Sequence, residues 1–344
     1  MSRIGITMGD PKGVGPELIA KAWKEMEPAI RQKIRIYGDR TVLDVSAKMV
    51  GTTFDPKQLV ITSSVAGPVG NISEPDASRI TLLALKAAIV DIKAGSIDAL
   101  VTAPVNKFRM QITEPNFTGH TETLAKAAGV RDVIMMFACP PVMPDSTLAK
   151  QVGLPIANLC SANTKPIYYD KLRISLVTTH LPLKEVSAHI SKHKILTTIH
   201  LTVEALKRFF DCERPRIAVL SLNPHAGEGG VLGTEEEEVI VPAIGRARKE
   251  GIICFGPFTS DALFGKKEID FDAVIAMYHD QGLTPMKIIC PDRVVNVTLG
   301  LPFVRTSPGH GTAEDIAWRG QARSESMISA IEMADHLLRK QGKV

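Results

Sequence analysis

Short β-branched runs alternate with longer amphipathic segments along almost the whole chain. Helical patterns cover residues 16–27, 74–94 and 119–128, and a further one begins after Asp39. The predicted strands lie at 3–7, 33–37, 98–102, 133–137, 172–178, 216–222, 272–277 and 293–298. This alternation favours an α/β fold, in which helices cover both faces of a mostly parallel sheet.

The clearest single element is the helix predicted over residues 74–94. Ser73 is placed to cap its N-terminus, with Asp76 as the reciprocal partner three residues later. A proline in the first turn and Gly95 after the last turn are typical of helix ends.

The length and charge of the chain favour a soluble enzyme over a nucleic-acid-binding or membrane protein. About two domains are expected for 344 residues, and 44% hydrophobic residues suffice for their cores. The net charge of +4 comes with no dense block of Lys and Arg, which argues against nucleic acid and anionic membranes as partners. No apolar run reaches the ~18 residues of a membrane span, and no signal-peptide pattern is present. We therefore expect a cytoplasmic protein.

The distribution of the cysteines also favours a cytoplasmic protein. Five of them are scattered at positions 139, 160, 212, 254 and 290, without a C-x-x-C pair. This is neither a disulfide framework nor a zinc ribbon. We expect them to be buried small hydrophobes in a reducing environment.

Three histidines each follow a predicted strand. They are His180, His225 and His279, in short runs that read as loops. Ligands of open α/β sheets bind beyond the carboxyl ends of strands, and neutral imidazole is the commonest metal ligand. One such histidine alone is more simply explained as capping a strand or binding a backbone group. Three in the same topological position favour a metal site with coordination positions left for substrate.

Two other segments could bind anions. Glycines at 9, 13 and 15 follow the first strand and open a helix, but their spacing matches neither the dinucleotide fingerprint nor a P-loop. A simple strand-to-helix turn explains them equally well. The run 118–122 puts His120 and Thr121 at a helix start, where the dipole favours anions; the alternative is a Thr-capped helix.

Two conspicuous polar clusters are given structural interpretations. The four glutamates at 235–238 are expected to open a helix capped by Thr234, with Glu237 completing a capping box. His189 and His193 have metal-compatible spacing, but their polar neighbours indicate a solvated helix face.

The segment 139–170 breaks the alternation. It contains five prolines and no clean periodicity. A structureless stretch of this length is unusual inside a compact domain, and it could be a lid, an oligomer arm or a variable insertion.

With these residues in view, the chain resembles the 4-hydroxythreonine-4-phosphate dehydrogenase family of pyridoxal phosphate synthesis, over nearly its whole length. The motifs that carry the resemblance are Thr-Met-Gly-Asp-Pro at 7–11, Gly-Val-Gly-Pro-Glu at 13–17, Thr-Ala-Pro-Val-Asn-Lys at 102–107, Gly-His-Thr-Glu at 119–122, Thr-Thr-His-Leu-Pro-Leu at 178–183, and the runs 223–230, 276–283, 295–302 and 305–308.

The resemblance implies NAD-dependent oxidation of a phosphorylated hydroxy acid, followed by loss of carbon dioxide. It also implies one divalent ion per site (Zn, Mg, Co or Mn) and a homodimer with a shared active site, one metal histidine coming from the neighbouring chain. The implied metal ligands are His180, His225 and His279. The implied substrate-binding residues are His120, Thr121, Lys287, Asn296 and Arg305.

Two features depart from the family pattern. Gly309 replaces the aspartate of the usual Ser-Pro-Asp-His-Gly-Thr-Ala run, and residues 139–170 look like extra sequence. The first could change cofactor or substrate contacts, and the second could cover the site or alter the dimer.

A second resemblance concerns the cofactor. The run 310–316 is similar to the adenosine-binding loop of isopropylmalate and isocitrate dehydrogenases, which bind NAD without the usual fingerprint. By this fold-level analogy, the cofactor-binding residues are His310, Gly311, Thr312, Ala313 and Asp315, with NADP as an alternative to NAD.

A two-domain α/β/α fold like that of those dehydrogenases is therefore expected. The first domain, on the cofactor side, would comprise 1–130 and 299–344. The second, with the metal histidines and dimer interface, would comprise 131–298 and carry the insertion near 139–170.

The residue types suit the implied chemistry. A divalent ion lowers the pKa of a bound alcohol and polarises the ketone that hydride transfer forms. Arg305 offers a planar fork and Lys287 a point charge to phosphate. The proton acceptor stays open between Lys287, Asp280 and a metal-bound water.

Three functions follow as hypotheses. The first is oxidation and decarboxylation of 4-hydroxythreonine 4-phosphate to 3-amino-2-oxopropyl phosphate. The second is a dehydrogenase of a phosphorylated sugar acid such as erythronate or threonate 4-phosphate, which would keep the same residues. The third is a non-catalytic binding protein, which the retention of all three histidines and both cations disfavours.

Overall fold

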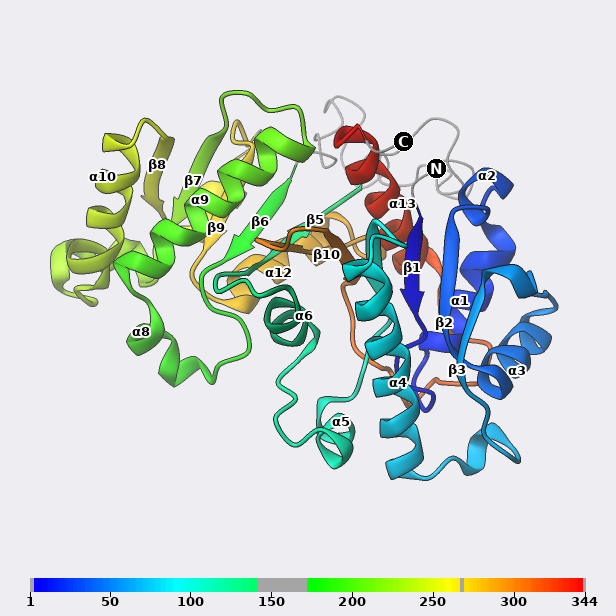
Figure 1. Cartoon of the computed structure of the whole chain (residues 1–344). Helices are drawn as coiled ribbons and strands as arrows, with labels where there is room; N and C mark the ends of the chain where they lie inside the picture. Colours follow the sequence, from blue (N-terminus) through cyan, green and yellow to red (C-terminus); the bar gives the residue numbers. More distant parts are fainter. Residues whose placement is uncertain (1–2, 141–171, 267–268, 343–344) are drawn as a thin grey trace, which may run out of the picture. The chain divides into compact units, whose positions relative to one another are not determined.

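The computed structural model describes residues 3–140, 172–266 and 269–342. The described chain divides into two compact α/β units, residues 3–131 with 301–342 and residues 132–140 with 172–300. Each unit contains a sheet with helices packed on it (Figure 1). Most of the segment 139–170 lies outside the described residues, so the predictions made for it are not tested.

The first unit is built on a five-stranded parallel sheet. Every pair of neighbouring strands in it is parallel, so their carboxyl ends meet at one edge. Its strand order is β3 (Leu59–Ser63), β2 (Ile34–Asp39), β1 (Ile4–Thr7), β4 (Ala99–Thr102) and β11 (Val304–Pro308).

Helices cover both faces of this sheet, and all four residues of β1 and of β4 are therefore buried. Helix α4 packs on β1, β2 and β3, while α13 packs on β11 and β4, with α1 between α13 and α3 (Figure 1). The helices are α1 (Gly15–Glu25), α2 (Pro28–Arg31), α3 (Arg40–Val50), α4 (Glu74–Lys93), α5 (Lys107–Thr113), α6 (His120–Ala128) and α13 (Glu325–Lys340).

Helix α4 forms as its sequence predicts. The hydroxyl of Ser73 accepts a hydrogen bond from the backbone N–H of Asp76 at 3.2 Å and donates one to the Asp76 carboxylate at 2.7 Å. Gly95 follows the last turn with a φ of +71°, a conformation that glycine adopts without a steric penalty.

The second unit contains a six-stranded mixed sheet. Two of its strand pairs, β10 with β5 and β5 with β6, are antiparallel, whereas the remaining pairs are parallel. Its strand order is β10 (Val295–Leu299), β5 (Ile134–Ala138), β6 (Arg173–Leu176), β9 (Ala273–Ala276), β7 (Arg216–Leu220) and β8 (Ile253–Phe258).

Alternate residues of its central strands enter two separate cores. Ile275 belongs to the core that α9 and α10 complete, whereas its neighbour Val274 belongs to the core that α12 completes. The two cores lie on opposite faces of the sheet, which is the layering expected for an α/β unit. The helices are α8 (Val186–His189), α9 (Lys192–Phe209), α10 (Val241–Lys249), α11 (Ser260–Phe264) and α12 (His279–Ile289).

The predicted α/β class with mostly parallel strands is confirmed, but three strands escape prediction. Strand β3 is half-exposed, and β8 contains a Gly-Pro pair, which usually argues against a strand. Strand β11 carries a buried arginine, threonine and serine in place of an apolar run.

Cys139, Cys254 and Cys290 are buried as predicted, but their pairing differs from the prediction. The structure pairs Cys139 with Cys290 as a disulfide, while Cys212 and Cys254 are free. Residues 151 apart in sequence meet here because β5 leads to Cys139 and α12 ends at Cys290, a proximity that spacing alone cannot show.

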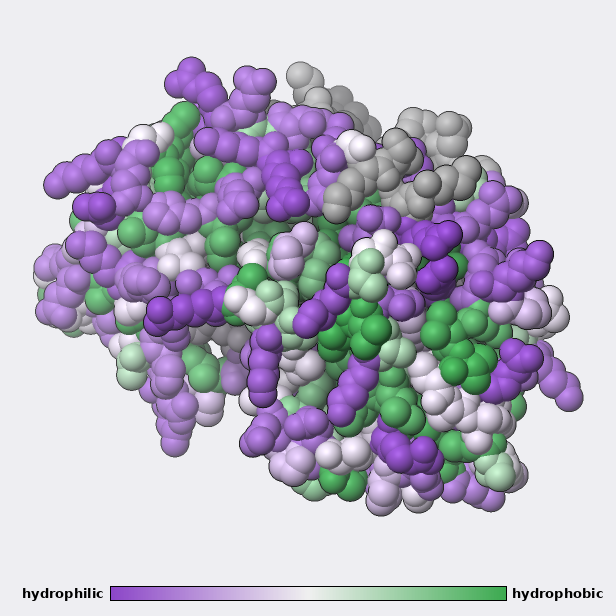
Figure 2. Space-filling model, in the orientation of Figure 1, coloured by the Kyte–Doolittle hydropathy of each residue, from purple (hydrophilic) through white to green (hydrophobic). Residues whose placement is uncertain are grey.

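No helix in the described parts of the chain is long and apolar enough to cross a membrane. Hydrophilic side chains predominate on the face drawn in Figure 2.

Candidate functional site

Two of the three predicted metal histidines lie side by side in the second unit. His180 follows β6 and His279 follows β9, and these strands pair in parallel, with Leu176 opposite Ala276. The two imidazole centroids are 5.6 Å apart. The loops are joined where Thr178 donates two hydrogen bonds, from its backbone N–H and its hydroxyl, to the carbonyl of Met277 at 3.1 and 2.7 Å.

Further contacts orient His279. Its Nδ1 donates to the carboxylate of Asp280 at 2.8 Å, and its ring lies edge-on to Phe137 at 5.8 Å. A carboxylate on Nδ1 fixes the ring and leaves Nε2 as the nitrogen suited to a metal, an arrangement common among metal-ligating histidines.

His225 lies in the loop after β7, the strand next to β9. The carboxyl ends of β6, β9 and β7 are therefore at one edge, as predicted for all three histidines. The loop takes left-handed conformations, with φ of +51° at His225, +54° at Ala226 and +45° at Glu228. Such a run is costly for residues other than glycine and persists only when its surroundings hold it.

Glu236 holds the residues that lead into this loop. It is 2% exposed, and its Oε1 accepts hydrogen bonds from the backbone N–H groups of Leu222 and Asn223, both at 2.8 Å. Its Oε2 accepts from the side chain of Asn223 at 2.9 Å. The glutamates open a helix as predicted, because residues 236–240 form a π-helix that leads into α10, but this helix has no side-chain cap, so the predicted capping by Thr234 is wrong.

His180 and His279 fit part of a divalent-ion site. No group of three or more His, Cys, Asp or Glu side chains that could hold a metal occurs within the described ranges of this one chain. The structure thus brings two of the three histidines together and leaves the full ligand set a prediction.

The remaining candidates of this unit lie on α12 and β10. Burial lowers the pKa of Lys287, and the charge of Asp292 partly offsets that effect. The side-chain oxygen of Asn296 is buried and has no hydrogen-bond partner in the portion of the chain that is described. A buried oxygen without a partner carries a free-energy cost that a bound ligand would relieve.

The first unit holds a separate group of candidates around Arg305, on β11. Arg305 is 4% exposed, and its Nη2 donates to the hydroxyl of Thr102 at 2.7 Å. His120 and Thr121 open α6. Burial, followed by the charges of Arg305 and Lys107, lowers the pKa of His120 to about 3. A buried guanidinium beside a neutral imidazole at a helix N-terminus is suited to an anion.

Lys107 was not among the predicted site residues. A side-chain Cβ built at Gly119 would lie 3.6 Å from the Lys107 Nζ, which places this cation at the start of α6. The lysine stands inside the motif 102–107, but a single lysine there gives no sign of its neighbours across the fold.

The predicted cofactor residues form a loop that packs on the glycine-rich turn. The backbone N–H of Val14 donates to the carbonyl of Thr312 at 2.9 Å, and His310 Nε2 contacts the hydroxyl of Ser326 at 2.7 Å. A Cβ at Gly13 would lie 2.9 Å from the carbonyl oxygen of Thr312. Gly13 is therefore required for the close approach of two loops.

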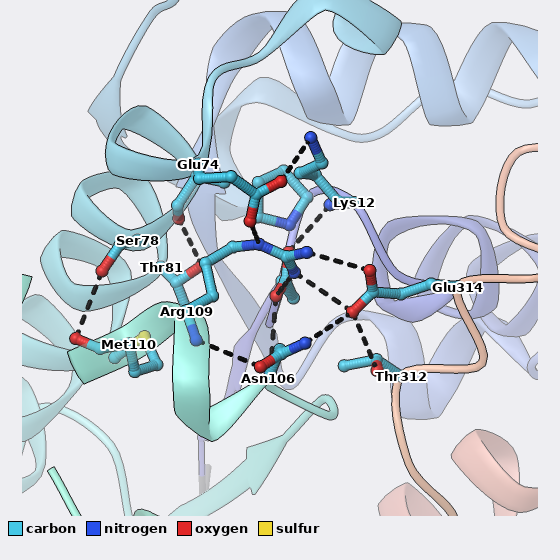
Figure 3. A network of polar contacts seen from close by, with 12 residues as sticks. Lys12, Glu74, Ser78, Thr81, Asn106, Arg109, Met110, Thr312 and Glu314 are labelled. Carbon is cyan, nitrogen blue, oxygen red and sulfur yellow. Dashed lines mark hydrogen bonds and ion pairs between the residues drawn. The ribbon is translucent and has the colours of Figure 1, made fainter. Parts of the chain in front are cut away.

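A buried arginine that prediction missed lies beneath the same loop. Figure 3 shows Arg109 reaching both Glu74 and Glu314, with Asn106 also donating to Glu314 at 2.8 Å. Beside it is a cavity of about 540 Å³, whose walls include Lys12, Glu314 and Trp318. No sequence motif marked Arg109, because its partners come from three distant segments.

The fold and the candidate site together indicate an enzyme that acts on a small molecule. Mostly parallel α/β sheets with histidines and cations beyond their strand ends are typical of enzymes that act on small molecules. The chain belongs to the family of the pyridoxal phosphate biosynthetic protein PdxA, whose model matches residues 24–334.

Relatives of known name agree with this assignment. The 4-hydroxythreonine-4-phosphate dehydrogenase of Aquifex aeolicus is 38% identical over 98% of this chain and 99% of its own length. That of Desulforapulum autotrophicum is 41% identical over 96% and 94%. A crystal structure of the Klebsiella pneumoniae enzyme of the same name aligns with a TM-score of 0.75 at 31% identity, covering 98% of this chain and 99% of that one.

Proposed function

We propose that this chain is a 4-hydroxythreonine-4-phosphate dehydrogenase. The reaction would be NAD-dependent and divalent-metal-dependent oxidation and decarboxylation of 4-hydroxythreonine 4-phosphate to 3-amino-2-oxopropyl phosphate. The relatives named above support the oxidoreductase assignment. The observation that carries the proposal is the pair of imidazoles of His180 and His279 at adjacent parallel strand ends.

His180, His225 and His279 would hold the divalent ion, which supplies Lewis acidity at the substrate hydroxyl. The loop 310–315 would hold NAD, which would supply the hydride acceptor for the oxidation. The side chains of the protein would bind and orient the substrate and exchange protons with it.

Phosphate binding is assigned to the first unit. Because the pKa of His120 is lowered to about 3, its imidazole is neutral at pH 7 and can donate or accept a hydrogen bond without adding charge. Burial also lowers the pKa of Arg305 to about 10, which still leaves the guanidinium charged at pH 7. Thr121 adds a hydroxyl at the start of α6.

Proton transfer is assigned to Lys287. Its pKa is lowered by burial, so the neutral amine, which can accept the hydroxyl proton, is reached more readily. The side chain of Asp280 is 82% exposed and engaged with His279 Nδ1, so we assign Asp280 to orienting that imidazole. The buried oxygen of Asn296 would accept a hydrogen bond from the substrate.

The test is a substrate panel with NAD and each divalent metal, following NADH and carbon dioxide together. We expect both products from 4-hydroxythreonine 4-phosphate, loss of both after chelation, and recovery when metal is returned. Turnover of erythronate or threonate 4-phosphate alone would move the assignment to a sugar-acid dehydrogenase. Ligand binding without NADH from any member of the panel would indicate a non-catalytic protein.

A further inference from the structure

We propose that Arg109 is a positioning residue for cofactor binding, which holds the loop 310–315 against the glycine-rich loop 9–14. This proposal rests on the proposed function, because it takes 310–315 to be the NAD-binding loop. Arg109 lies on α5 and is distant in sequence from both loops.

The contacts of Arg109 join three segments through three carboxylates. Its Nη1 and Nη2 donate to the two oxygens of Glu314 at 3.2 and 2.9 Å. Its Nε donates to Glu74 at the start of α4, and its Nη1 also reaches Asp10 in the glycine-rich loop. Asn106 donates to the same Glu314 carboxylate at 2.8 Å (Figure 3).

Only an arginine can make this set of contacts. A guanidinium has five N–H donors in a rigid plane, whereas a lysine is a single point charge. The side chain of Arg109 is 6% exposed, so the contacts are formed away from bulk water. Burial alone would lower the pKa of Arg109, but hydrogen bonds and charges from Glu314, Glu74 and Asp10 raise it.

The contact with Glu314 matters for an anionic cofactor. Glu314 lies between Ala313 and Asp315, in the loop proposed to bind NAD, and the pyrophosphate of NAD carries negative charge. The hydrogen bonds from Arg109, the largest of several causes, lower the pKa of Glu314, so its carboxylate is charged. Arg109 neutralises that charge by donating to both oxygens, so the carboxylate would repel a bound dinucleotide less.

Hydrogen bonds to backbone carbonyls also join the two segments. Besides the bond between Val14 and Thr312, the indole N–H of Trp318 donates to the carbonyl of Pro11 at 2.8 Å. Asp10, which Arg109 contacts, also accepts from the backbone N–H of Lys12 at 2.9 Å. Both loops are thus fixed around one guanidinium.

The test compares Arg109→Lys with Glu314→Gln and the double variant. Arg79→Lys is the matched control, because Arg79 also pairs with a carboxylate, Asp76, but is 52% exposed and contacts neither loop. Hydrogen–deuterium exchange is measured first without cofactor. NAD titration and the KM values for NAD and for the phosphorylated substrate follow.

We expect faster exchange in 9–14 and 310–318 for Arg109→Lys and about a tenfold rise in the Kd and KM for NAD, since small misplacements of binding groups cost that much or more. The KM for the phosphorylated substrate should stay within about twofold, and the Arg109→Lys effect should shrink in the Glu314→Gln background. Arg79→Lys should change none of these.

The outcomes separate this proposal from the proposed function. Unchanged exchange, or faster exchange with an unaltered Kd for NAD, overturns the positioning role. A wild-type protein that binds no NAD overturns the proposed function, and faster exchange in Arg109→Lys would then still support the contact between the loops. Glu314→Gln changes a side chain that is 36% exposed, so it supplies the test if Arg109→Lys does not fold.

Discussion

At the scale of single residues, the fourfold glutamate run shows how much one side chain can differ from its neighbours. Glu236 is buried and holds the loop of His225, whereas Glu237 and Glu238 are exposed. The sequence presents them as equivalent. What distinguishes Glu236 is a set of backbone N–H groups 13 and 14 residues away, which only the tertiary fold brings within reach.

Replacing Glu236 by alanine should remove three hydrogen bonds and leave two backbone N–H groups without their acceptor. The free energy of unfolding should fall by about 2–4 kcal/mol. Because the loop carries His225, metal affinity should fall as well. Urea unfolding and metal titration check both, with Glu237→Ala as the control. Equal effects of the two substitutions would show that Glu236 has no special role.

His120 should make the protein sensitive to acid. Its pKa is about 3 in the folded state against 6.5 ordinarily, so below pH 6.5 the unfolded state binds a proton that the folded state does not. Stability therefore falls as pH decreases through this window, by about 2 kcal/mol between pH 7.5 and 5. His120→Asn should lose correspondingly less in urea unfolding at the two pH values. His193→Asn, on the exposed side of α9, is the control, and identical pH dependence of wild type and His120→Asn would refute the assignment.

At the scale of elements, regular patterns were predictable and polar or irregular ones were not. Helix α4 and its Ser73 cap follow from local rules, and the positions of the three histidines follow from strand ends. Strand β11 does not, because burial of Arg305 depends on neighbours such as Thr102 that are remote in sequence. For the same reason Arg109 and Glu236 could not be found from the sequence, since their partners are defined by the fold.

The packing of α12 on its sheet is testable through Gly282. A Cβ there would lie 2.7 Å from Leu176 Cδ2 and 3.0 Å from Ile174 Cγ2, on the strand that leads to His180. Gly282→Ala should push α12 away and destabilise the protein by about 1–3 kcal/mol. Since α12 begins at His279, metal binding should weaken too. Gly245→Ala in α10, where a Cβ meets nothing within 4 Å, is the control and should be neutral or stabilising. A similar result for both substitutions would show that the contact between α12 and β6 accommodates an added methyl group.

At the scale of the whole molecule, the pairing of His180 with His279 bears on assembly. If His225 of a neighbouring chain completes the metal site, inactive His225→Ala chains mixed with inactive His279→Ala chains should regain activity. Each mixed dimer would hold one intact site and one with both defects, so random exchange should restore about a quarter of the wild-type activity. Subunit exchange is verified with two affinity tags.

The control for this mixture is His180→Ala with His279→Ala. These residues lie 5.6 Å apart, centroid to centroid, in one chain, so every site of that mixed dimer would lack a ligand. Background activity is expected there. Recovery in the control, or none in the first mixture despite mixed dimers, would refute a shared site of this composition.

The antiparallel pairing of β10 with β5 has a consequence for modularity. Among the described residues, the chain leaves the first unit after Arg131 and returns to it after Gly300. Leu299 lies opposite Ile134 in the sheet, so the second unit begins and ends at neighbouring points. A module whose ends meet can be inserted into a host chain, or circularly permuted, with little disturbance to either partner. The second unit therefore has the geometry of a transplantable insert, joined to its host by two adjacent strands.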